Sequence, residues 1–186
     1  MNTSTLAEIA AWAAVLSGIA TLFTFVTGVL FFSTHRPSLG KLNDISAIVQ
    51  LLFMLPLPWA LYQLFGSEVP ALAVGAAVVG TAGIVVGIVG QSLLVARRIT
   101  FEQSTKFMPS GGAIGLWLLF LGLQALISGT PAAGYVWAAL AAAAGYLMMV
   151  IGFLAGGYKN PLFNIGSMLL VISYPIWTIL LRSLLV

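Results

Sequence analysis

Hydrophobic residues run along this chain in six long segments, and most charged residues fall in the short stretches between them. Roughly 20 apolar residues, at about 1.5 Å per residue, cross the hydrocarbon core of a bilayer as an α-helix. A membrane β-barrel would instead alternate apolar and polar residues, which these segments do not do. We therefore predict an all-α, polytopic transmembrane bundle of six helices that forms one domain over 1–186. The expected helices are 5–32, 44–65, 70–96, 112–129, 131–155 and 161–185.

The connections carry signals for the ends of helices. Gly129 suits a left-handed helix end, and Asn160 followed by Pro161 is typical of a cap and a first turn. Asn43 and Asp44 are expected to open the second helix, where an anion suits the helix dipole. The first segment starts close to the first residue and has no cationic region before it, so we interpret it as a permanent span.

The distribution of charge predicts the orientation. Charged residues make up 6% of the chain, against about 25% in soluble domains. Six of the seven cations lie in or beside the first, third and fifth connections, which is the positive-inside pattern with both termini outside. This asymmetry accounts for the net charge of +3 without a nucleic-acid partner. The six cations are Arg36, Lys41, Arg97, Arg98, Lys106 and Lys159.

Small residues recur at helical spacing within the spans. Gly80, Gly83, Gly87 and Gly90 share one face of the third helix. Helices associate in lipid through close backbone approach, which such faces permit. We interpret them as packing seams inside the bundle, with a homo-oligomer interface as the alternative. Further small residues follow the same spacing at Ala14, Ser17, Thr21, Thr24, Gly28, Gly111, Gly115, Gly122, Ala138, Ala142, Gly145, Gly152 and Gly156.

Prolines interrupt two of the apolar segments. Pro56 and Pro58 are expected to break the second helix, and Pro175 to break the sixth at a similar depth, each freeing a carbonyl. Broken helices near the midplane can build transport sites, whereas a kink satisfied by its neighbours is structural. Tyr174 is expected to point into the bundle, toward a freed carbonyl or Gln50. The candidate ligand or polar cluster is Gln50, Pro56, Ser173, Tyr174 and Pro175.

Two charged residues lie within the outer ends of their helices. Glu8 and Arg182 can form an ion pair that lowers the cost of placing charge near hydrocarbon. Each can equally extend to water on its own.

Residue types that support catalysis are scarce in this sequence. His35 is the sole histidine and there is no cysteine, so we predict no metal site, no haem, no other cofactor and no enzymatic activity. The basic stretch 97–111 contains Phe101, Phe107 and Met108. These can lie along an anionic leaflet, or the stretch can serve only to fix the topology.

Two stretches carry a family resemblance: GKLNDISAIVQLLFMLPLPWALYQL, and GYLMMVIGFLAGG followed by NPLFNIGSMLLVISYPIWTILLRSLL. They resemble a widespread family of bacterial six-span integral membrane proteins to which no activity is assigned. The resemblance implies a six-helix bundle in a bacterial inner membrane and carries over no functional residue.

These observations lead to two functional hypotheses. The first is a non-enzymatic accessory, sensory or structural subunit that binds membrane lipids, other membrane proteins or further copies of itself. The alternative is a small transporter or channel with a midplane site at the proline breaks of the second and sixth helices.

Overall fold

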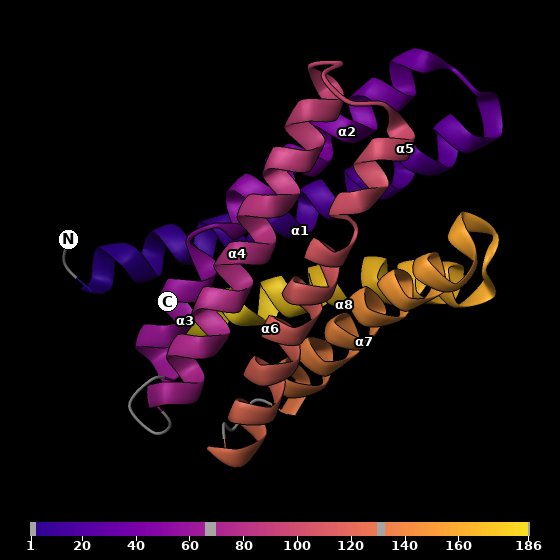
Figure 1. Cartoon of the computed structure of the whole chain (residues 1–186). Coiled ribbons are helices and arrows are strands. Elements are labelled where there is room, and N and C mark those ends of the chain that lie inside the picture. The colour runs from indigo at the N-terminus through magenta and orange to yellow at the C-terminus, as the bar shows by residue number, and fades with distance from the viewer. Residues whose placement is uncertain (1–2, 66–69, 130–132, 186) are drawn as a thin grey trace.

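The computed structural model describes residues 3–65, 70–129 and 133–185, where every regular element is helical (Figure 1). Six stretches within these ranges are long and apolar enough to cross a membrane, so the predicted six-helix membrane fold is confirmed. The elements are α1 (Thr3–Thr34), α2 (Pro37–Met54), α3 (Leu57–Phe65), α4 (Pro70–Val95), α5 (Phe101–Ser104), η1 (Thr105–Phe107), α6 (Pro109–Ile127), α7 (Ala133–Gly156), η2 (Gly157–Lys159) and α8 (Pro161–Leu185).

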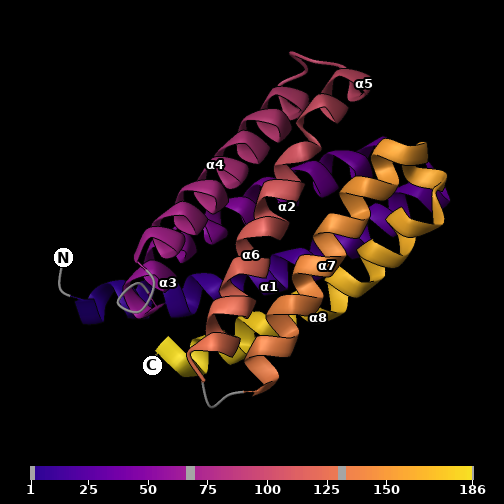
Figure 2. The same ribbon diagram turned by 60° about the horizontal axis from the view of Figure 1, so that its bottom comes forward.

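The six spans close into a ring. Each span packs against the next one in the sequence, with α2 and α3 together forming the second span, and α8 returns to pack against α1. The two ends of the chain lie at one end of the bundle in both views, and the α1–α2 turn and the α4–α5 connection lie at the other (Figures 1 and 2). We call this second end, which also carries η2, the basic end.

The second span starts earlier than predicted. Helix α2 begins at Pro37, which fits the first turn after an extended Arg36, and not at Asp44. Asn43 therefore does not cap the helix. Its side-chain amide donates to the Thr24 carbonyl of α1 at 2.6 Å. The polar residues before Asp44 thus belong to the first turns of α2 and not to a loop, and the side chain of Asn43 among them binds the neighbouring helix.

The predicted helix ends differ in how well they match the structure. Gly129 adopts φ +66 after α6, as expected, and the Asn160 side chain accepts a hydrogen bond from the Leu162 amide at 2.9 Å. Helix α6 begins at Pro109, three residues before the predicted start. The connection before it contains the short helix α5, which is held by a reciprocal capping box between Thr100 and Gln103.

The two proline sites have different effects on their helices. Helix α2 ends at Met54 and α3 begins at Leu57, so the predicted break at Pro56 and Pro58 is confirmed. At Pro175 the prediction is wrong, because α8 continues from Pro161 to Leu185. Two prolines spaced two residues apart remove two nearby amide donors, whereas one leaves the turns on both sides intact.

Glycines bring the spans close together. A methyl group on Gly83 would lie 2.9 Å from both the Ser110 carbonyl oxygen and the Ala113 side chain of α6. A methyl group on Gly166 of α8 would lie 2.7 Å from the Gly145 carbonyl oxygen of α7. At such places two helix backbones meet with nothing between them, and this produces the dispersion contact that holds helices together in lipid.

Candidate functional site

Tyr174 links buried polar groups of different helices. Its side chain is fully buried, as predicted, and its hydroxyl lies 2.9 Å from Ser17 Oγ on α1. Ser17 Oγ also donates to the Ala14 carbonyl at 2.7 Å. Because a serine hydroxyl carries one proton, Tyr174 is the donor to Ser17. The predicted partners, a freed carbonyl or Gln50, are therefore replaced by a hydroxyl from the first span.

Gln50 reaches the same region through a different tyrosine. Its side-chain nitrogen donates to the Tyr146 hydroxyl at 3.3 Å, and the rings of Tyr146 and Tyr174 meet edge to face at 6.4 Å. Side chains from α1, α2, α7 and α8 thus converge in one polar cluster. Tyr146 is absent from the predicted cluster, although a tyrosine inside an apolar span indicates that its hydroxyl has a hydrogen-bond partner.

The other predicted members of the cluster lie elsewhere. Ser173 donates to the Leu169 carbonyl of its own helix at 2.7 Å. Pro175 packs against α1, where a methyl group on Gly18 would lie 3.3 Å from its Cα atom. Pro56 lines a groove along a different face of α1. The two prolines therefore do not form a shared midplane site.

Aromatic rings fill the centre of the helix ring. The Trp177 ring centroid lies 6.0 Å from that of Trp117, 6.1 Å from that of Tyr135 and 5.5 Å from that of Tyr174, and all four side chains are fully buried. Met54, beside the break in the second span, is also fully buried. The centre is packed with side chains, which is the arrangement of a structural core.

Arg182 stacks on an aromatic ring. Its guanidinium carbon lies 4.5 Å from the ring centroid of Trp12. Among the residues that the structure describes, Arg182 and Glu8 form no ion pair. An arginine over an exposed indole keeps its charge near the interface while its stem covers apolar surface. The structure thus favours the alternative in which Glu8 and Arg182 each reach the interface separately, without pairing with one another.

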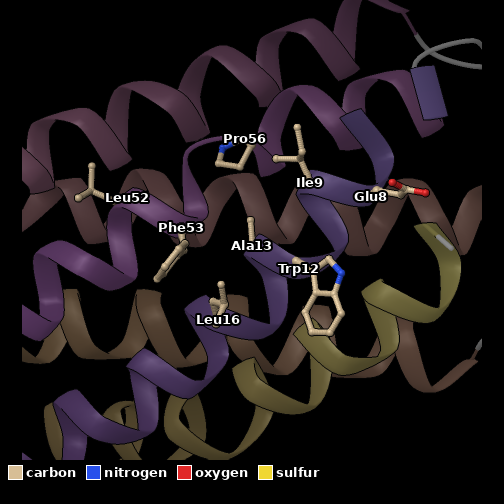
Figure 3. Close-up of a pocket in the computed structure, with 8 residues that line it drawn as sticks. All are labelled: Glu8, Ile9, Trp12, Ala13, Leu16, Leu52, Phe53 and Pro56. Carbon is tan, nitrogen blue, oxygen red and sulfur yellow. The ribbon is translucent and has the colours of Figure 1, made fainter. Parts of the chain in front are cut away.

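An apolar groove runs along α1 beside the break in the second span (Figure 3). Its volume is about 460 Å³. Its walls come from the first half of α1 on one side and from the end of α2 on the other, and Glu8 is its charged residue. The lining residues are Glu8, Ile9, Trp12, Ala13, Leu16, Leu52, Phe53 and Pro56.

Groups that hold metals do not gather in this part of the chain. Across the described ranges, no three side chains of histidine, cysteine, aspartate or glutamate lie close enough to hold a metal ion. The polar cluster instead consists of serine, glutamine and tyrosine side chains bonded to one another. Such groups can orient and stabilise packed helices.

Comparisons with protein-family models, with curated proteins and with solved structures returned no match. The resemblance to a bacterial six-span family therefore stays a prediction.

Proposed function

We propose that this chain is a non-enzymatic accessory subunit that binds another integral membrane protein within the bilayer, through the outward surface of α1. We call this surface the α1 face. It consists of seven exposed apolar side chains at alternating spacings of three and four residues: Ile9, Trp12, Leu16, Ile19, Phe23, Val26 and Leu30.

The observation that carries the proposal is the low burial of α1. In its most apolar window 28% of the residues are buried, against 39–44% in the other five spans. The helix packs against α2 on one side and α8 on the other, and as the longest helix in the described residues it still leaves a broad apolar surface outside the bundle. A span that leaves this share of its residues outside the bundle has the surface to pack against a helix of another protein.

The groove makes part of the α1 face concave, whereas a surface that only contacts lipid chains needs no defined shape. It places a concave apolar surface beside Trp12 and Leu16, where a side chain from a partner helix can insert. A dimer with its two-fold axis through this groove would face one hollow with another and leave both unfilled. The geometry therefore favours a different protein, with a convex apolar helix, over a second copy.

The packed centre of the ring gives no support to the alternative of transport. Trp117, Trp177 and Tyr174 occupy the place where a central pathway would run. The polar cluster beside these rings consists of two hydrogen-bonded pairs, Ser17 with Tyr174 and Gln50 with Tyr146. For the location, the family resemblance supports a bacterial inner membrane, and the charge pattern supports termini that face outward.

Site-specific photo-crosslinking in native membranes tests the proposal. A photoreactive residue at Leu16 is expected to form an adduct with a different protein, while the same residue at Leu123 of α6 forms none. The two leucines are matched, because each is 39% exposed. Leu52→Trp fills the groove and is expected to abolish the Leu16 adduct without changing the melting temperature.

Three results would overturn the proposal. Equal adducts at Leu16 and Leu123 would indicate nonspecific contact, and no adduct at Leu16 would indicate that lipid covers the face. An adduct with twice the mass of this chain would assign the face to a second copy.

A further inference from the structure

The three connections at the basic end meet at one tyrosine. The Tyr158 ring stacks on Phe101 of α5 with centroids 5.7 Å apart, and lies 6.0 Å from Phe32 at the end of α1. It also contacts Phe153 and Phe163 of the α7–α8 hairpin, at 4.8 and 5.1 Å. Aromatic contacts thus bring the ends of α1 and α5 and the α7–α8 turn to one place.

Most cations of the chain belong to the same three connections as this aromatic cluster or to the helical turns beside them. Six of the seven lie on the connections that meet there or on the turns beside them, and all six are exposed. None of them forms an ion pair within the described residues. We call this set the basic rim: Arg36, Lys41, Arg97, Arg98, Lys106 and Lys159.

One member of the basic rim occupies a backbone position that suits glycine. Arg97 has φ +56. The Arg97 amide donates to the Leu94 carbonyl and the Arg98 amide to the Leu93 carbonyl, both at 2.9 Å, which defines a Schellman helix end with Arg97 in the left-handed position. An L-residue with a side chain is strained there. An arginine at this place therefore lowers the stability of the turn, which a bound anion can offset.

We propose that the basic rim binds the headgroups of anionic phospholipids in the adjoining leaflet. Lysine and arginine side chains at a membrane surface attract anionic headgroups. Phe32 and Phe101 are exposed beside them, and aromatic rings favour the boundary between headgroups and acyl chains. Apolar rings next to cations suit a lipid better than a free anion. This surface is separate from the α1 face, and the two proposals stand independently.

Thermal unfolding in nanodiscs tests the proposal. The protein is placed in phosphatidylcholine discs with an increasing mole fraction of phosphatidylglycerol. We expect the melting temperature to rise with phosphatidylglycerol and the rise to shrink at high salt, because salt screens exposed charges. The measured quantity is the phosphatidylglycerol fraction that gives half of the rise.

Two variants separate lipid binding from a general effect on stability. Arg97→Gly is expected to raise the melting temperature in pure phosphatidylcholine, since it relieves the left-handed position, and to increase the half-rise fraction about fivefold. Arg182→Gln removes a cation at the opposite end of α8 and is expected to leave that fraction unchanged.

The proposal fails if the wild-type protein melts at the same temperature in both lipids. It also fails if Arg182→Gln shifts the half-rise fraction as much as Arg97→Gly, because the response would then follow net charge alone. If inorganic phosphate in phosphatidylcholine discs reproduces the rise, the rim binds a free anion and the lipid assignment is wrong.

Discussion

Gly166→Ala tests whether direct backbone contact between α7 and α8 holds the bundle together. The new methyl group would lie 2.5 Å from the Met149 amide nitrogen and 2.7 Å from the Gly145 carbonyl oxygen. The shorter contact is about 0.9 Å inside the 3.4 Å at which ordinary contact begins. Both atoms belong to the backbone of α7, so no side chain can rotate away. The two helices must separate to admit the methyl group.

The size of the effect follows from two opposing contributions. Overpacking typically costs about 1–3 kcal/mol, and a rigid backbone neighbour favours the upper half of that range. Alanine is favoured over glycine in a helix by up to about 1 kcal/mol. We therefore expect a net loss of roughly 1–2 kcal/mol. For a chain of this length that corresponds to a fall in melting temperature of roughly 2–8 °C.

Reversible unfolding in detergent micelles measures this loss, and Gly75→Ala is the matched control. Gly75 lies within α4, and a methyl group there would meet no atom within 4 Å. This variant should keep or slightly raise the melting temperature. Gly145→Ala in the Gly166→Ala background should cost less than it does alone, because the helices are already apart. If the Gly166→Ala and Gly75→Ala variants have the same melting temperature, backbone contact does not hold these helices together and the reasoning is refuted.

Two further predictions concern the polar cluster and the orientation. Tyr174→Phe is expected to lower the free energy of unfolding by about 1 kcal/mol, because the hydrogen bond to Ser17 is lost. A double-mutant cycle with Ser17→Ala measures the coupling between the two side chains. A coupling energy near zero would show that this hydrogen bond contributes nothing to stability. Because the chain has no cysteine, single substitutions report its topology: Thr5→Cys should react with an impermeant thiol reagent in intact cells and Ser38→Cys should not, while the reverse pattern would place the basic end outside.

The number and identity of the spans could be predicted from the sequence. Long apolar runs determine transmembrane helices because lipid offers no partner to an unpaired backbone group, so each run must satisfy its own hydrogen bonds. The same local logic correctly predicted the break at Pro56, the left-handed Gly129 and the Asn160 cap. Each of these features depends on residues within about one turn of one another.

Local sequence patterns did not correctly predict the start of α2 or the course of α8 at Pro175. Asn43 looks like a helix cap in the sequence, but in the fold it donates to α1, and α2 begins at Pro37. Pro175 looks like a break, but α8 continues through it beside Gly18. At Asn43 a neighbouring helix decides the outcome, because a contact between helices competes with the local preference. At Pro175 the loss of a single amide donor is too small a change to end the helix.

The sequence by itself determined a six-span helical membrane protein and placed Tyr174 inside it. Only the tertiary structure decided that Ser17 is the partner of Tyr174, that Gln50 bonds to Tyr146, and that Arg182 lies over Trp12. Periodicity indicates which face of a helix is buried, but the helices that meet there are set by the closed ring in which α8 packs against α1. That closure is a property of all six spans together, so no single segment encodes it.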